Sequence, residues 1–326
     1  MPRMKAVLYE SLGAAKDVLR VADVPRPEPG AGEVRVRLRF SGVNPTDWKS
    51  RSGATPRAID GFQIPHHDGS GTIDAVGPGV PSDRVGERVW VWLAAAGRRW
   101  GTAAEWTVVP SHQATRLPDS ASLELGASLG VPALTAHRCL FADGDLRGRT
   151  ALVAGGAGAV GHFAIELAKY RGAQVVATVS GPEKAEMARA AGADLVVNYR
   201  DSDALERLRA FAPRVDRVVE VNLAANLALD LALCGAGSVI SAYAADGPDP
   251  QLPVRACMGA NVVLRFVLLF GVPPQALADG AAEVTAALDA GALSELPVRR
   301  FALEECAAAE EAVQARAVGK VVLEIP

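Results

Sequence analysis

The chain has 326 residues, of which 49% are hydrophobic and 22% charged, which predicts a folded protein of about two domains. A formal net charge of −3 offers no basic surface for nucleic acid or anionic membranes. The four cysteines are far apart and form no CxxC pair, so reduced thiols are favoured over a disulfide framework or a cysteine-rich zinc site. The first residues lack the apolar core of a secretory signal, and we expect a cytoplasmic protein.

The first third of the chain is predicted to be rich in β-strands. In residues 33–40, apolar residues alternate with Glu33, Arg35, Arg37 and Arg39, which indicates one buried face and one solvent-facing arginine row. Similar short segments between glycines and prolines predict further strands. They are residues 4–10, 70–77, 87–94 and 103–110.

The pattern changes near residue 121, where residues 121–141 have apolar positions at helical spacing and predict a pair of helices. Apolar strands then alternate with helices up to residue 244, which predicts a parallel sheet covered by helices on both faces. The predicted strands are 150–155, 173–180, 194–199, 214–221 and 237–244.

The last part of the chain reads as a helix at 274–290, a strand at 298–303, a helix at 303–315 and a strand at 319–325. This tail is too small to fold alone, so we expect it to return to the first domain. The predicted domains are therefore 1–127 completed by 272–326, and 128–271.

A glycine-rich turn joins the strand at 150–155 to the following helix. Its Gly155, Gly158 and Gly161, with Ala159 and Val160, fit a dinucleotide-binding turn. Such a turn reverses tightly and presents a helix N-terminus to the phosphates of a coenzyme. The alternative is a structural turn in another kind of α/β domain.

The end of the next strand bears on the choice of coenzyme. Residues 178–181 contain no acid, whereas an NAD site places Asp or Glu there to accept from the ribose. Ser180 can donate to a 2′-phosphate and Lys184 can supply positive charge, so the sequence favours NADPH. Exposed polar residues that any helix start could carry are the alternative.

With these residues in view, the chain resembles the medium-chain dehydrogenase/reductase superfamily, and within it the zinc-independent quinone oxidoreductase branch that includes zeta-crystallin. The resemblance covers nearly the whole chain. The motifs that carry it are SGVNPTDWKSRSG (41–53), HHDGSGTIDAVGPGV (66–80), GERVWVW (86–92), VPALTAHRCL (131–140), the glycine turn, GADLVVNYR (192–200) and VGKVVLEI (318–325).

This resemblance implies a GroES-like β-barrel domain and a doubly wound Rossmann domain, with the active site in the cleft between them. It implies that Tyr199 joins Ser180 and Lys184 around the 2′-phosphate, and that Gly319 and Lys320 reach the coenzyme from the tail. An edge tyrosine and an ordinary strand-start lysine are the alternatives. Around the nicotinamide it implies Asn44, Thr135, Ala242, Tyr243, Leu269 and Phe270. It also implies a homodimer that pairs through residues 261–270.

No catalytic metal is expected. The zinc enzymes of this superfamily use a cysteine, a histidine and a second cysteine, but this chain has Asn44, His67 and Val131 at the corresponding places. One histidine does not supply the three protein ligands of a catalytic zinc site. His66, His67 and Asp68 could form a partial metal site, or they could shape the turn.

Without a Lewis acid, reduction of an activated double bond is better suited than alcohol oxidation. We therefore predict an NADPH-dependent reductase of quinones or α,β-unsaturated carbonyls. Asn44 is the predicted polar group beside the acceptor, or else a turn residue before Pro45, and Lys49 or a water is the predicted proton donor. Lys49 could equally be a solvated surface lysine.

Trp90, Trp92 and Trp100 could line the site, with core packing as the alternative for the first two. The alternative functions are an enoyl-thioester reductase of a polyketide or fatty-acid type pathway, for which Arg98 and Arg99 could serve, and an NADPH-binding protein with little catalysis.

Overall fold

The computed structural model describes residues 2–55, 58–245 and 247–326, and these form two compact units. Unit 1 comprises Met1–Val131 and Glu295–Pro326, and unit 2 comprises Pro132–Ser294. The predicted domain limits differ where the chain returns to unit 1, because residues 272–294 belong to unit 2. There α9 (Pro274–Asp289) packs against α4 (Ala159–Tyr170), and its Glu283 pairs with Arg171 at 2.8 Å.

Unit 1 is built on a seven-stranded sheet in the order β14-β15-β3-β4-β5-β7, with β6 also paired to β3. All of its pairs are antiparallel except β14 with β15, and a separate hairpin joins β1 to β2. The strands are β1 (Arg3–Leu8), β2 (Arg20–Pro25), β3 (Glu33–Val43), β4 (Asp68–Val76), β5 (Arg88–Val91), β6 (Trp106–Pro110), β7 (Ala114–Arg116), β14 (Val298–Ala302) and β15 (Lys320–Glu324).

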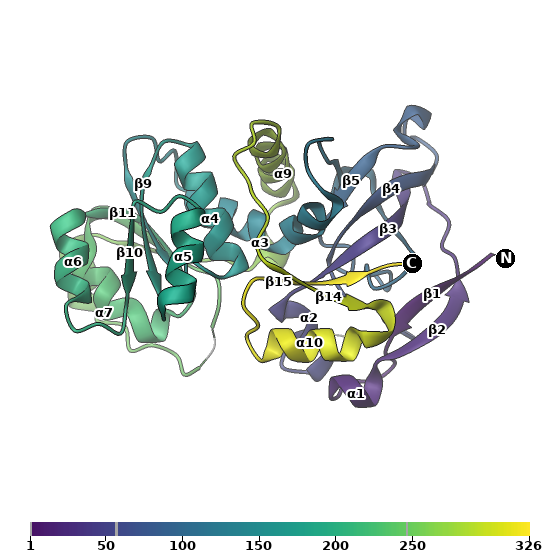
Figure 1. Cartoon of the computed structure of the whole chain (residues 1–326), viewed down its shortest axis with the longest axis horizontal. Helices are drawn as coiled ribbons and strands as arrows, with labels where there is room; N and C mark the ends of the chain where they lie inside the picture. Colours follow the sequence, from purple (N-terminus) through teal and green to yellow (C-terminus); the bar gives the residue numbers. More distant parts are fainter. Residues whose placement is uncertain (1, 56–57, 246) are drawn as a thin grey trace. The chain divides into compact units, whose positions relative to one another are not determined.

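Three helices accompany this sheet: α1 (Ala15–Val18), α2 (Pro45–Ser52) and α10 (Cys306–Gln314). Figure 1 shows α10 alongside β14 and β15. The helix contacts both strands and also α2. Short 3-10 turns lie at Ser82–Arg84, Ser111–Gln113 and Leu303–Glu305. The tail of the chain thus joins the sheet that begins near residue 33, because β15 pairs with β3.

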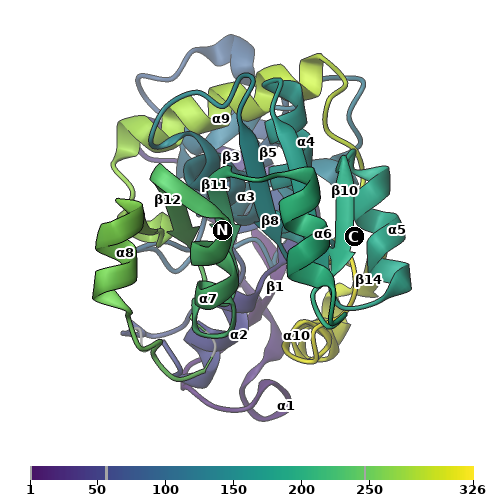
Figure 2. The same cartoon turned by 90° about the vertical axis from the view of Figure 1, so that its left-hand side faces the viewer.

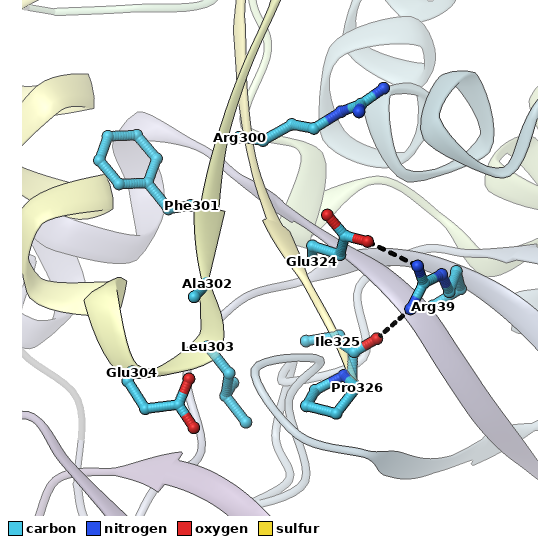
Figure 3. Close-up of a pocket in the computed structure, with 9 residues that line it drawn as sticks. All are labelled: Arg39, Arg300, Phe301, Ala302, Leu303, Glu304, Glu324, Ile325 and Pro326. Carbon is cyan, nitrogen blue, oxygen red and sulfur yellow. Dashed lines mark hydrogen bonds and ion pairs between the residues drawn. The ribbon is translucent and has the colours of Figure 1, made fainter.

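The alternation in β3 places Val34, Val36 and Leu38 in the core of unit 1, as expected. The expected solvent-facing arginine row is wrong at Arg35, whose side chain is buried. Its guanidinium lies 2.6 Å from Glu28 and 2.8 Å from Asp74, and these two carboxylates compensate for the loss of water. Arg39 is exposed and binds Glu324 and the carbonyl of Ile325 at a shallow surface pocket (Figure 3).

Unit 2 contains a six-stranded parallel sheet in the order β10-β9-β8-β11-β12-β13, the doubly wound Rossmann arrangement expected from the sequence. In Figure 1, α4 and α5 lie on one side of the sheet, and α6 and α7 on the other. Figure 2 shows α6 and α7 in front of the strands. The elements are β8 (Thr150–Ala154), β9 (Gln174–Val179), α5 (Pro182–Ala190), β10 (Leu195–Asn198), α6 (Ala204–Phe211), β11 (Val215–Glu220), α7 (Leu223–Leu233), β12 (Cys234–Ala242), α8 (Val254–Ala260), β13 (Val263–Phe266) and a 3-10 turn at Leu269–Gly271.

The expected pair of helices before β8 is one helix, α3 (Leu123–Phe141), with Pro132 inside it. Proline removes one backbone donor of the helix without ending it here. In the part of the chain that the structure describes, no helix is long and apolar enough to cross a membrane.

Two buried carboxyl groups face each other between β11 and α7. Glu220 accepts hydrogen bonds from the backbone N–H of Asn222 and, at 2.9 Å, from Asn226 Nδ2. Burial and the adjacent Glu220 raise the pKa of Asp230 to about 9, and burial also raises the pKa of Glu220. Since two adjacent buried carboxyl groups do not both ionise readily, the pair holds a shared proton at neutral pH.

We predict that Asp230→Asn flattens the dependence of stability on pH. The pKa of Asp230 is raised on folding, so between pH about 4 and about 9 the folded chain holds a proton that the unfolded chain has lost. Stability therefore falls as pH rises through this window, by up to about 1.4 kcal/mol per pH unit. Urea unfolding at several pH values measures the slope. The exposed Asp17→Asn is the control, and equal slopes for Asp230→Asn and the unaltered chain would contradict the assignment.

Candidate active site

The backbone of the glycine turn after β8 requires glycine at two of its positions. Gly155 has φ +72°, a left-handed conformation that favours glycine. A Cβ on Gly161 would lie 2.3 Å from the carbonyl oxygen of Gly155, which forbids any side chain there. These two glycines are therefore required for the turn to close and for α4 to pack against it.

Gly158 is different, because the fold leaves space at this position. It is exposed at the N-terminus of α4 with φ −78° and ψ 161°, which other residues adopt readily. A Cβ there would meet only the Gly155 oxygen, at 3.4 Å. Ala159 and Val160, half-buried, begin α4, whose first backbone N–H groups form an anion-binding helix terminus. The space above Gly158 thus suits a bound phosphate.

A polar cluster gathers where β9 and β10 end. Lys184 Nζ donates to Ser180 Oγ at 3.1 Å, and the Arg200 guanidinium donates to the Ser180 carbonyl at 3.2 Å. Arg200 also stacks over the ring of Tyr199, 5.7 Å from its centroid. The structure therefore brings the predicted Ser180, Lys184 and Tyr199 together and adds Arg200, the residue after Tyr199 in the quoted motif, which the sequence analysis left unassigned.

The other predicted coenzyme residues of unit 2 are placed by strand register. Val153 pairs with Val219, and Ala242 pairs with both Glu220 and Phe266, so the carboxyl ends of β8, β11, β12 and β13 share one edge. Ala242 and Tyr243 lie at this edge, where β12 ends next to β11, and Leu269 and Phe270 follow β13. Thr135 is buried within α3.

In unit 1 the predicted Asn44 is the centre of a buried hydrogen-bond network. It ends β3 and caps α2, where its backbone N–H donates to Asp47 Oδ2 at 2.7 Å. Its Nδ2 donates to Asp68 Oδ2 at 2.6 Å, and its Oδ1 accepts from Lys320 Nζ at 2.7 Å. Lys320 Nζ also lies 3.8 Å from Asp68 Oδ2. Three strands, β3, β4 and β15, thereby meet at one amide group.

Lys320 is buried, and the residue before it explains how it is held. Gly319 has φ +81°, and a Cβ there would lie 2.0 Å from the Pro297 carbonyl oxygen. The Lys320 N–H donates to that same oxygen at 2.9 Å. Gly319 is thus needed for close backbone packing, and Lys320 is directed at Asn44 and Asp68.

The electrostatics of this network follow from burial. Burial raises the pKa of Asp68, and the Lys320 ammonium opposes the rise. Burial lowers the pKa of Lys320, and Asp68 opposes that change. The ammonium on Asn44 Oδ1 polarises the amide and strengthens its N–H groups as donors. Because an amide nitrogen carries two protons, Asn44 can donate a second hydrogen bond to a ligand.

Lys49 is half-buried on α2, with its Nζ 5.8 Å from the centroid of the Trp48 ring. Trp90 and Trp92 are fully buried and belong to the core, and Trp100 packs edge-on against Phe62. Arg98 bonds to Gln113, and Arg99 lies 2.6 Å from Asp60. Both arginines are therefore engaged within unit 1.

The positions that correspond to zinc ligands do not form a ligand set. The second oxygen of Asp68 accepts the Val131 N–H at 2.8 Å, so its two oxygens are held by Asn44 and Val131. Only His67 of the expected three positions offers a ring nitrogen. In the described residues, the group of close His, Cys and acidic ligands is His66, Cys306 and Glu310, which excludes His67 and Asp68.

Comparison with known proteins agrees with this architecture. The "Alcohol dehydrogenase GroES-like domain" family matches residues 30–119, and the "Zinc-binding dehydrogenase" family matches residues 159–286. The quinone oxidoreductase of Pseudomonas aeruginosa is 32% identical over 322 residues, which span 96% of each chain. The chain belongs to the quinone oxidoreductase branch of the medium-chain dehydrogenase/reductase superfamily.

Two solved structures show the same fold over the full length. A mycobacterial protein complexed with NADPH is 31% identical, with a TM-score of 0.85 over 98% of this chain and 99% of that one. An NAD-dependent alcohol dehydrogenase is 28% identical, with a TM-score of 0.89 over 99% of this chain and 100% of that one. The names of these two proteins thus give NADPH for one and NAD for the other.

We predict that Gly158→Ala and Gly161→Ala separate coenzyme binding from folding. Gly158→Ala should fold normally but weaken NADPH binding about tenfold, or about 1.4 kcal/mol, because its methyl group enters the phosphate space. Gly161→Ala should lower the free energy of unfolding by about 2 kcal/mol or more through its backbone clash. Calorimetric titration and thermal unfolding measure the two effects. Unchanged NADPH affinity in Gly158→Ala would count against the phosphate site.

Proposed function

We propose that this enzyme transfers a hydride from NADPH to a quinone or an α,β-unsaturated carbonyl compound without a catalytic metal. The observation that carries the proposal is the Lys320–Asn44–Asp68 network. In it the Asn44 amide is already bonded to an ammonium and a carboxylate and keeps one N–H for a ligand.

The chain's residues fit NADPH. The open space at Gly158 and the start of α4 suit the pyrophosphate. Lys184 and Arg200 supply two positive charges beside Ser180, which suits a 2′-phosphate that a carboxylate at the same place would repel. Tyr199 and the stacked guanidinium of Arg200 offer a flat surface to the adenine end.

NADPH supplies the hydride when bound, and the protein's task is to orient the acceptor and to stabilise the charge that develops on its oxygen. Asn44 Nδ2 is the proposed donor to that oxygen, with the Lys320 ammonium behind it. An enolate or hydroquinone oxygen spreads its charge by conjugation, so hydrogen-bond donors are sufficient. Lys49 or a water delivers the final proton.

We predict that NADPH oxidation, followed by absorbance, is faster with quinones and alkenals than with enoyl thioesters, and faster with NADPH than with NADH. Incubation with a chelator during the assay should leave the rate unchanged. Lys49→Met should lower kcat and alter its pH profile if Lys49 donates the proton, with Arg116→Met as a surface control. Preference for enoyl thioesters would favour the thioester reductase, and tight NADPH binding without turnover would favour a binding protein.

We also propose a homodimer that forms along β13, the last strand of the parallel sheet. This edge carries large exposed apolar side chains, among them Phe266 at 74% and Leu268 at 69% exposure. Met258 on the neighbouring α8 is 71% exposed. A second copy of the same strand would pair its backbone groups and cover these side chains.

We predict that the chain sediments as a dimer and that Phe266→Glu shifts it toward monomer, because the substitution places a charge in the proposed interface. Val85→Glu, at an exposed apolar residue of unit 1, is the matched control and should leave the sedimentation coefficient unchanged. A monomer for the unaltered chain at micromolar concentration would reject the dimer.

A further inference from the structure

Unit 1 contains a second buried polar cluster that the proposed reaction does not use. His66 precedes β4, and Cys306 and Glu310 lie one turn apart on α10. His66 Nε2 lies 3.8 Å from Cys306 Sγ and 3.5 Å from Glu310 Oε1, and the three ligand atoms all lie within 4.8 Å of one another. All three residues are fully buried.

His66 and Glu310 each have one polar atom that is held by a neighbouring residue. The other polar atom of each side chain is directed into the cluster. His66 Nδ1 lies 3.0 Å from Ser41 Oγ, which fixes the ring with Nε2 toward Cys306. Glu310 Oε2 accepts from Arg51 Nε. Glu310 Oε1 is buried and accepts no hydrogen bond from the described residues. Metal-binding histidines and carboxylates are characteristically held in this way through their second atoms.

The backbone at His66 is a separate indication. Its φ of +73° is left-handed, a conformation in which glycine is most at ease. Glycine at this position would remove the backbone strain. The residue is nevertheless a histidine, and its imidazole packs against a thiol and a carboxylate. Backbone strain of this kind concentrates at functional sites.

We propose that His66 Nε2, Cys306 Sγ and Glu310 Oε1 bind one divalent ion of the zinc type in a structural role. Zinc bonds of about 2.0 to 2.3 Å at tetrahedral angles separate ligand atoms by roughly 3.3 to 3.6 Å. The two distances from His66 Nε2, 3.5 and 3.8 Å, are close to this range, and Cys306 Sγ and Glu310 Oε1, which lie within 4.8 Å of each other, approach on binding. Nitrogen, sulfur and carboxylate oxygen are the ligands that zinc prefers.

The charges around the site also fit. A thiolate and a carboxylate offset the two charges of the ion, and Arg51 pairs with the same carboxylate through Glu310 Oε2. Asp47 interacts electrostatically with His66, Cys306 and Glu310, and its buried Oδ1 accepts no hydrogen bond from the described residues. A water completes the fourth position. The three proposed ligands have no role in the proposed reaction, so the metal content can be tested independently of the reaction.

The test is the metal content of the full-length protein, produced in medium supplemented with zinc and freed of loosely bound ions by a chelating resin. We expect about one zinc per chain, and a loss of at least tenfold in Cys306→Ser and in Glu310→Gln. Cys139→Ser removes another fully buried thiol, far along the chain in unit 2, and should keep its zinc. Zinc content near zero in the unaltered protein would overturn the proposal, and so would retention of zinc in Cys306→Ser.

Cobalt and a glycine variant give a second readout. Protein refolded with Co²⁺ should show a thiolate-to-cobalt charge-transfer band that Cys306→Ser lacks and Cys139→Ser retains. His66→Gly removes a ligand while relieving the left-handed backbone, so it should fold, bind no cobalt and show no rise in Tm on addition of zinc, whereas the unaltered chain should gain several degrees. Equal responses of the two proteins to zinc would show that the cluster is a buried ion-pair network only.

Discussion

The contact between Lys320 and Asn44 is the constraint on which unit 1 depends. It joins side chains 276 positions apart in the sequence and fastens β15 to the turn between β3 and α2. Asp68 closes the same network from β4. A buried ammonium is stable only when it is paired and hydrogen-bonded. Each of the three residues therefore offsets part of the desolvation cost of burying the other two. The proposed chemistry uses the result, an amide that is rigid and polarised.

Much of this architecture could be predicted from local sequence. The period of two in β3, the apolar strands of unit 2 and the spacing of Gly155, Gly158 and Gly161 are set by neighbours in the chain, and so they are legible without the structure. The pair Ser180 and Lys184 was also predictable, because both lie at or just after the end of an identified strand, whereas Tyr199 was assigned to the same cluster by the family resemblance. Arg200 was visible in the same motif but needed the stacking geometry to gain a role.

The remaining features depend on contacts that distant segments make. Arg35 occupies a position that the alternation assigns to solvent, and only the approach of Glu28 and Asp74 makes its burial possible. The single helix across Pro132 reflects packing that outweighs the loss of one hydrogen bond. The nearness of His66 to Cys306 and Glu310 has no sequence signal, since the chain between them includes the whole of unit 2.

The divided course of unit 1 has a consequence for biosynthesis. Residues 132–294 form one continuous unit, whereas the sheet of unit 1 lacks β14 and β15 until the residues that follow unit 2 have been made. During translation the continuous unit is able to fold first. At that stage β3 and the apolar groups around it still lack their last partner, because β15 has not been made. The period between these two events exposes a half-built sheet, and chaperone protection is needed most at that stage.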